Sequence, residues 1–302
     1  MRADVNRPNI VVIVGPTGSG KTDLAVRLAR RFHGELIAAD SRTVYRGMDI
    51  GTAKSSEPHY LTDIRNPNAP YSVAEFKTDA ERYIQEITAR GKLPIVVGGT
   101  GLYIQALVDN LTLPALPAQP KLREAFERKS IRELLTLLRK LDPKAARMID
   151  RKNKRRIIRA LEVCVFTGHP FSEQRTRGES RFHVLELGIE RTRLALYRRI
   201  DARVRGMFRA GLAAEVERLM KRYGSNIEPL RGIIYRDVVE WLQQPIDRRS
   251  SIRELAQRIM FANHRYARHQ LMWFKRDQRI HWVRTPRQAE KLVREFLEVV
   301  GK

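Results

Sequence analysis

Three short apolar runs near the start of the chain have the pattern of strands buried in a parallel sheet. Ile10–Val14 is continuously apolar and β-branched and stops at Gly15, and similar runs lie at Leu36–Ala39 and Pro94–Val97. Strands covered on both faces read as unbroken hydrophobic runs, because neither face meets water. The pattern therefore predicts the central strands of a parallel sheet.

A helix is predicted between the second and the third run. Ser72 is a residue type that favours the N-cap, Glu75 follows three residues later, and Gly91 comes directly after Arg90. These residues form the signature of a capping box and of a glycine stop. The alternation of strands and helices predicts an α/β fold with a doubly wound sheet, whose functional loops lie at the carboxyl ends of the strands.

The pattern changes after the proline cluster Pro114, Pro117 and Pro120. The elements predicted beyond it are a basic helical segment at 121–167, short strands at 183–187 and 280–283, and long amphipathic helices at 193–223 and 251–274. We therefore expect three parts, namely the first part of the core at 1–120, a helical insertion that grips its partner at 121–180, and the remainder of the core with C-terminal helices at 181–302.

Charge divides the chain in a similar way. Of the 302 residues, 58 are Lys or Arg and 34 are Asp or Glu, which gives a formal net charge of +24. Residues 1–110 hold 14 basic and 12 acidic side chains, so the rest of the chain holds 44 and 22 and carries +22. Arginine-rich helical surfaces can reflect genome composition alone. A near-neutral first part followed by a strongly basic remainder nevertheless favours a polyanionic partner, most simply nucleic acid.

Composition also excludes several classes of protein. A hydrophobic content of 42% is ordinary for a globular chain and argues against a disordered or fibrous one. The single cysteine, Cys164, allows no disulfide within the chain and favours a reducing compartment. The polar N-terminus is predicted to be neither a signal peptide nor a membrane span. We expect a cytoplasmic monomer without a zinc site, in which Cys164 is an inert core thiol.

A phosphate-binding motif follows the first predicted strand. The sequence G-x-x-x-x-G-K-[ST] is satisfied by Gly15, Pro16, Thr17, Gly18, Ser19, Gly20, Lys21 and Thr22. Glycines let the backbone wrap a phosphate so that its N–H groups and a helix N-terminus face the anion. Lys21 adds a positive charge and the Thr22 hydroxyl is placed to bind Mg²⁺. The motif predicts a bound di- or triphosphate, and it leaves the reaction open.

A carboxylate beside this loop is the first candidate for the chemistry. Asp40 ends the second predicted strand, whereas the third ends in the GGTG sequence around Thr100 and offers a hydroxyl but no carboxylate. An acid at such a position can be a metal ligand, a general base or merely an N-cap. The residues alone do not choose among these three roles.

Five further stretches accompany the P-loop in one order along nearly the whole chain. They are DSRTVYRGMDIGTAK at 40–54, VVGGTGLY at 96–103, RIIRALEV at 156–163, LYRRIDARVRGMFRAGLAAEV at 196–216 and RHQLMWFKRDQRIHWV at 268–283. With these stretches the chain resembles the tRNA dimethylallyltransferases, also called tRNA isopentenyltransferases. A shared P-loop alone would not produce so many matches. The fold implied is a P-loop NTPase-like core with a helical insertion domain.

The resemblance implies transfer of the dimethylallyl group of dimethylallyl diphosphate to the exocyclic N6 of an adenine next to the anticodon of tRNA. In this interpretation the P-loop, with Lys21 and Mg²⁺, holds the diphosphate leaving group. Asp40 matches the family's general base, Thr100 helps to position the reacting groups, and Arg203 is a second cation on the diphosphate. Arg203 also has a simpler interpretation as part of a solvated helix face, because seven arginines lie between 191 and 209.

The resemblance also implies where the anticodon stem-loop of tRNA is contacted. The implied positions are Asp40, Ser41, Arg42, Thr43, Thr100, Arg123, Arg155, Arg156, Ile157, Ile158, Arg159, Arg231, Gly232, Ile233, Ile234, Tyr235 and Arg236. Composition agrees independently, since six of the nine residues at 151–159 are basic. The aromatic residues at 261–282 are interleaved with basic ones and suit either a stacking platform for RNA or a hydrophobic core.

Two other functions remain open from the residues. A P-loop kinase acting on a small molecule or nucleoside would explain residues 15–22 but would leave the +22 remainder without a role. A non-catalytic RNA-binding NTPase switch would use the charge but would leave Asp40 and the GGTG loop without one.

Overall fold

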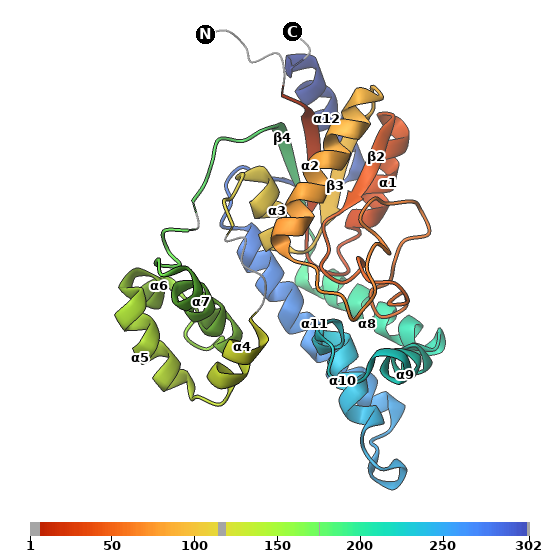
Figure 1. Ribbon diagram of the computed structural model, residues 1–302. Helices are drawn as coiled ribbons and strands as arrows, with labels where there is room; N and C mark the ends of the chain where they lie inside the picture. Colours follow the sequence, from red (N-terminus) through yellow and green to blue (C-terminus); the bar gives the residue numbers. More distant parts are fainter. Residues whose placement is uncertain (1–6, 114–118, 175, 301–302) are drawn as a thin grey trace. The chain divides into compact units, whose positions relative to one another are not determined.

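Figure 1 shows the computed structural model, which describes residues 7–113, 119–174 and 176–300. The chain forms two compact units. Met1–Val108 and Arg181–Lys302 together make the core unit, and Asp109–Ser180 makes the helical unit. The helical unit includes the insertion expected at 121–180 and starts earlier, at Asp109. Pro114 and Pro117, which mark the expected boundary, lie outside the described residues.

The core unit is built on a five-stranded sheet in the order β2-β3-β1-β4-β5, and all neighbouring strands are parallel. Its strands are β1 (Asn9–Val14), β2 (Gly34–Ala38), β3 (Leu93–Gly98), β4 (His183–Ile189) and β5 (His281–Val283). In this register Ile13 lies between Val97 of β3 and Leu187 of β4. Each predicted apolar run is a strand of this one sheet, so the α/β prediction is confirmed.

The helices of the core unit are α1 (Lys21–Arg31), α2 (Val73–Ala89), α3 (Gly101–Val108), α8 (Arg193–Arg209), α9 (Leu212–Tyr223), α10 (Ile233–Leu242), α11 (Ile252–Phe274) and α12 (Pro286–Val300), with short 3₁₀ turns η1 (Glu228–Arg231) and η2 (Ile246–Arg248). Ser72 and Glu75 form the predicted capping box of α2. The prediction of one helix over 193–223 is wrong. The segment forms two helices, α8 and α9, because Gly211 between them has φ of +93°, a left-handed conformation that interrupts the helix.

Helices cover both faces of the sheet. Side chains of β1 alternate between the faces, so Val11 and Ile13 pack with α1 and α12, while Val12 and Val14 pack with α2 and α3. A further hydrophobic cluster joins α8, α9, α10 and α11 to Met48 and its neighbours in the connection between β2 and α2. These helices lie beyond the carboxyl ends of the strands (Figure 1). The fold therefore places a helical wall opposite the loops that leave β1, β2 and β3.

The helical unit has a hydrophobic core of its own. Its helices are α4 (Pro120–Glu127), α5 (Ile131–Leu141), α6 (Pro143–Met148) and α7 (Lys154–Thr167). Ile157, Ile158 and Cys164 of α7 are buried in this core against leucines of α5. Burial raises the pKa of the Cys164 thiol, as expected for an unreactive core cysteine. Among the described residues, no helix is long and apolar enough to span a membrane.

Candidate active site

A cavity of about 330 Å³ lies at the carboxyl ends of β1, β2 and β3 in the core unit. Its walls come from the P-loop, the connection after β2, α8, the start of α10 and the inner face of α11. The lining residues that the sequence predicted are Thr17, Lys21, Thr22, Asp40, Ser41, Arg42, Thr43, Arg203, Arg231, Gly232, Ile233, Ile234 and Tyr235. The fold thus gathers candidates from widely separated stretches into one cavity.

The P-loop has the backbone of an anion cradle. Gly18 and Gly20 have φ of +76° and +90°, which residues with a side chain rarely adopt. Gly20 is the N-cap of α1 and receives no capping side chain, so N–H groups of the first helical turn stay available to a ligand. Inside the loop, the Lys21 ammonium donates to the Pro16 carbonyl at 3.4 Å. Gly15 and Ser19 complete the turn between β1 and α1.

Three arginines from one stretch of the chain contact three successive residues of the P-loop. Arg203 donates to the Thr17 hydroxyl at 3.4 Å and to the Thr52 carbonyl at 2.6 Å. Arg199 donates through Nε to the Gly18 carbonyl at 2.9 Å, and Arg191 donates to the Ser19 carbonyl at 2.6 Å. The solvated-face interpretation of Arg203 is therefore wrong. Sequence reasoning missed the other two arginines, because nothing in the arginine-rich stretch at 191–209 distinguishes them from their solvated neighbours.

The cavity holds more positive charge than the protein neutralises. Burial, together with the nearby charge of Arg203, lowers the pKa of Lys21 to about 8, while Asp40 opposes this shift. Burial also lowers the pKa of Arg203, again opposed by Asp40. Two desolvated cations that share one carboxylate gain much from an anionic ligand, since such a ligand returns the interactions lost with water. The cavity is therefore suited to a multiply charged anion.

Asp40 has one carboxylate oxygen engaged and one available. Its Oδ1 accepts the backbone N–H groups of Arg42 at 2.9 Å and Thr43 at 3.4 Å. No helix begins here, because the next one after β2 is α2, so the N-cap interpretation is wrong and the contacts instead shape a turn. Oδ2 accepts no hydrogen bond within the described residues, and the side chain lines the cavity. This geometry suits a general base, and it also suits a metal ligand.

Thr100 does not line the cavity but holds the backbone on either side of Asp40. Its hydroxyl accepts the Ser41 N–H at 3.2 Å, and its own N–H donates to the Ala39 carbonyl at 3.4 Å. Both residues that flank Asp40 are therefore held by Thr100. Gln270 of α11, which sequence reasoning missed, joins the neighbouring Gly99 to the P-loop.

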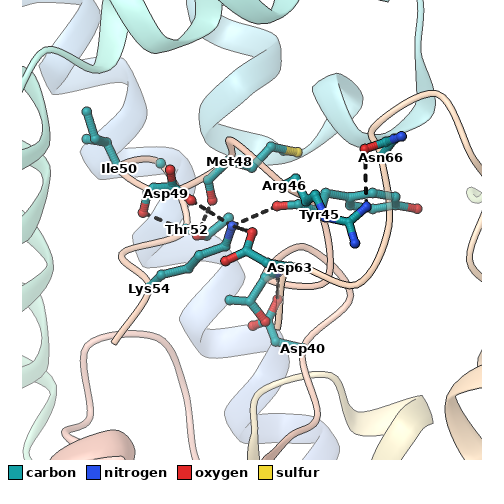
Figure 2. Close-up of polar contacts among 12 residues, drawn as sticks. Asp40, Tyr45, Arg46, Met48, Asp49, Ile50, Thr52, Lys54, Asp63 and Asn66 are labelled. Carbon is teal, nitrogen blue, oxygen red and sulfur yellow. Dashed lines mark hydrogen bonds and ion pairs between the residues drawn. The ribbon is translucent and has the colours of Figure 1, made fainter. Parts of the chain in front are cut away.

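The connection between β2 and α2 is folded by two buried charged side chains, Lys54 and Glu215, and Figure 2 shows the contacts of Lys54. The Lys54 ammonium donates to the Tyr45 carbonyl and to Asp49 Oδ1, both at 2.7 Å, and also to Asp63. Glu215 of α9 accepts the backbone N–H groups of residues 49–51 at 2.7–3.0 Å, together with the Tyr235 hydroxyl at 2.8 Å. These contacts fix the Thr52 carbonyl that receives Arg203. A lone glutamate among the apolar positions of α9 was the only sequence signal for this support.

Comparisons with known proteins connect this cavity to a family. A family model described as IPP transferase matches residues 43–277. A tRNA dimethylallyltransferase of Thermomicrobium roseum is 44% identical and covers 91% of this chain and 86% of its own length. Another, from Carboxydothermus hydrogenoformans, is 39% identical and covers 97% of both chains. This chain belongs to the IPP transferase family.

Solved structures of the family have the same fold. The full-length tRNA isopentenylpyrophosphate transferase of Bacillus halodurans is 34% identical, covers 98% of both chains and superposes with a TM-score of 0.72. A eukaryotic dimethylallyltransferase solved while acting on tRNA is 27% identical, with a TM-score of 0.72 over 88% of this chain and 69% of its own. The P-loop NTPase-like core predicted from the sequence is thereby confirmed.

The core-unit residues implied to contact tRNA differ in whether their side chains are already paired within the protein. Arg42 makes a two-point ion pair with Glu228, at 2.7 and 3.2 Å, and Arg231 donates to Asn226 at 2.6 Å. Arg236 is half-exposed and paired with Asp237. Gly232 and Ile233 form the start of α10 at the cavity wall. Most of these groups would have to exchange a protein partner for an RNA one.

The corresponding positions of the helical unit fall into three classes. Ile157 and Ile158 are buried in its core, so their side chains stabilise the unit and the direct tRNA contact expected of them is wrong. Arg123 and Arg159 bind the fully buried carboxylate of Glu162, at 2.9 and 2.7 Å. Arg155 and Arg156 are exposed and have no ion pair within the described residues.

Proposed function

We propose that this protein is a tRNA dimethylallyltransferase, which moves the dimethylallyl group of dimethylallyl diphosphate to N6 of an adenine adjacent to the anticodon of tRNA. The observation that carries the proposal is one cavity in which two desolvated cations, Lys21 and Arg203, face a carboxylate, Asp40, with an unengaged oxygen. Relatives that bear the name of this activity match nearly the whole chain.

The proposed reaction is a displacement at the allylic carbon. The N6 lone pair forms the new C–N bond, the C–O bond to the diphosphate breaks, and the diphosphate leaves with that electron pair. The N6 proton passes to Asp40 Oδ2. Lys21, Arg203 and the free N–H groups of α1 stabilise the charge that grows on the diphosphate, and fixed donors do so best where water is excluded. An exocyclic amine is a poor nucleophile, so a positioned base contributes about 10²–10⁴-fold.

Mg²⁺ fits the donors that the cavity provides. Thr22 and Asp40 both line it and offer a hydroxyl and a carboxylate oxygen, which are the hard ligands that Mg²⁺ prefers. When bound, Mg²⁺ would lower the charge of the diphosphate and make it a better leaving group. The Thr22 hydroxyl, at the first turn of α1, is the side chain that we assign to it.

An anticodon loop suits this site better than a duplex. A base in a single-stranded loop leaves its stack at low cost, and enzymes that modify base atoms extrude the target nucleotide into a pocket. The basic residues at 151–156 of the helical unit would bind phosphates of the tRNA, which favours affinity without selecting the base. A cytoplasmic monomer remains our prediction for the working state.

The decisive experiment incubates the purified protein and Mg²⁺ with unmodified tRNA and either dimethylallyl diphosphate or ATP. We expect the mass of tRNA to rise by one prenyl group, located on an adenine after nuclease digestion, only with dimethylallyl diphosphate. Rapid phosphate release from ATP without a prenylated adenine would reject the proposal and favour a kinase or an NTPase switch. The comparisons give neither of these alternatives support.

A further inference from the structure

We propose that Gln270 is a positioning residue that holds the diphosphate part and the acceptor part of the active site in register. The inference rests on the proposed function. Gln270 lies on α11, faces the cavity and is only 8% exposed. It carries no charge and touches neither Lys21 nor Asp40 through a hydrogen bond, yet it connects the loops that carry them.

The amide of Gln270 uses both of its ends on backbone groups. Oε1 accepts the Thr17 N–H of the P-loop at 2.9 Å, and Nε2 donates to the Gly99 carbonyl after β3 at 2.8 Å. A backbone N–H can only donate and a carbonyl can only accept, so this pair of partners fixes which end of the amide faces which loop. A carboxylate of the same shape would place an acceptor against the Gly99 carbonyl.

The link continues on both sides to the reacting groups. Gly99 precedes Thr100, which holds Ser41 and Ala39 on either side of Asp40. On the other side the Thr17 hydroxyl accepts from Arg203. Hydrogen bonds, joined through Thr17 and through the peptide bond from Gly99 to Thr100, therefore connect the cation assigned to the diphosphate, by way of the Gln270 amide, to the backbone that carries the assigned general base.

Gly99 offers a second way to disturb the same contact. A Cβ built on it would lie 2.6 Å from Gln270 Nε2, whereas the next nearest atoms, in Gly15 and Lys21, would be 3.6 Å away. Gly99 is not among the residues with positive φ, so its backbone accepts alanine. The amide of Gln270 is thus the one close obstacle among the described atoms to a methyl group at this position.

The expected effect is on the rate of transfer rather than on binding. Displacement needs N6 and the allylic carbon to approach to about 3–3.5 Å in line, and a misplacement of about 1 Å can cost roughly 100-fold. A loosened link would leave the diphosphate and the adenine bound but poorly aligned. A merely structural residue would instead lower the melting temperature and leave the rate of the folded enzyme unchanged.

The first arm of the test compares Gln270→Glu with Gln257→Glu, the same change at an exposed position of the same helix. We expect Gln270→Glu to lower kcat about 30-fold or more, with KM for tRNA and Tm close to wild type. The negative charge that it adds beside the P-loop should also weaken the binding of inorganic diphosphate with Mg²⁺. Gln257→Glu should match wild type in all four. A wild-type kcat in Gln270→Glu, or a loss of kcat explained by a parallel loss of Tm, would overturn the proposal.

The second arm uses Gly99→Ala, Gln270→Ala and the double variant. Each single change should lower kcat, and adding Gly99→Ala to Gln270→Ala should cost nothing more, because the obstacle is gone. Losses that multiply would show that the two residues act separately and would overturn the link. A wild-type protein that transfers no prenyl group overturns the proposed function and this inference together, whereas active wild type with an equally active Gln270→Glu overturns the inference alone.

Discussion

Arginine has different surroundings in the two units of this protein. In the core unit, Arg203 is held by the Thr52 carbonyl and the Thr17 hydroxyl and lines the cavity. In the helical unit, Arg155 and Arg156 are exposed, with no ion pair in the part of the chain that the structure describes. A cation fixed by hydrogen bonds can stabilise charge at one place, whereas an exposed cation acts over a Debye length and is screened by salt.

The helical unit also shows why a count of basic residues overstates how many side chains are available to bind RNA. Glu162 is fully buried, and burial alone would raise its pKa. Hydrogen bonds from Arg123, the Gln119 N–H and Arg159 outweigh burial, so the pKa of Glu162 is lowered and the carboxylate stays charged. These two arginines therefore complete the fold of their own unit, and only part of the +22 found in the sequence is free to bind phosphate.

Removal of the carboxylate at the cavity should have the largest effect on catalysis. Asp40→Ala is expected to lower the rate of prenyl transfer at least about 100-fold, because the N6 proton loses its acceptor, while tRNA affinity stays nearly unchanged. Single-turnover kinetics and filter binding measure the two quantities separately. Equal losses of rate and affinity would make Asp40 a docking residue and would remove the contrast between a catalytic core and a gripping surface.

The next largest effect should come from the arginines behind the P-loop. Because a planar peptide points its N–H away from its carbonyl, Arg191 fixes the direction of the Gly20 N–H by holding the Ser19 carbonyl, and Arg199 holds the preceding carbonyl. Two hydrogen bonds worth about 1 kcal/mol each imply roughly 30-fold weaker binding of inorganic diphosphate in Arg191→Gln/Arg199→Gln.

The matched control for this measurement is Arg198→Gln/Arg205→Gln, which removes the same two charges, since Arg198 and Arg205 are exposed neighbours on α8 that make no hydrogen bond within the described residues. Isothermal titration should show wild-type affinity for it. An equal loss in the control would mean that general charge, rather than the orientation of the loop, holds the diphosphate.

The sheet could be predicted because its signal is local. Unbroken apolar runs such as Ile10–Val14, and a capping box at Ser72 and Glu75, depend on residues close together in the chain. The break at Gly211 was missed because a single glycine inside an amphipathic pattern is compatible with a continuous helix, and its positive φ is decided by how α8 and α9 pack.

The site was predictable in part for the same reason. The P-loop and Asp40 follow strands directly, so their place at the carboxyl edge follows from the topology. Gln270, Glu215 and Lys54 depend on contacts between distant segments, and their residue types are equally common on solvated surfaces. Ile157 and Ile158 were predicted to contact RNA because they lie in a motif, although apolar side chains of this type usually pack in a hydrophobic core.

The pKa of Lys21 gives a smaller effect with a defined sign. Its value of about 8 means that the side chain is mostly charged at pH 7 and mostly neutral at pH 9. Affinity for inorganic diphosphate should therefore fall about tenfold over this range, which can be followed by titration calorimetry. Lys21→Arg keeps its charge, so it corrects for the titration of the ligand itself and should lack this fall. A parallel fall in both proteins would assign the pH dependence to diphosphate alone.

The exposed arginines should give the smallest effect, visible only when salt is varied. Each phosphate contact contributes a slope of about −0.7 to −0.9 to the dependence of log K on log salt, so Arg155→Ala/Arg156→Ala should flatten the slope by about 1.5. Between low and fourfold higher salt, the variant would lose roughly eightfold less tRNA affinity than wild type, with kcat at saturating tRNA unchanged.

Arg287→Ala/Arg294→Ala on α12 removes the same net charge from exposed positions of the core unit and should leave the slope as it is. An unchanged slope in the first variant would show that the cluster is a solvated surface. A flattened slope in both variants would show that tRNA responds to total charge, and the two units would then differ in chemistry but not in how they attract RNA.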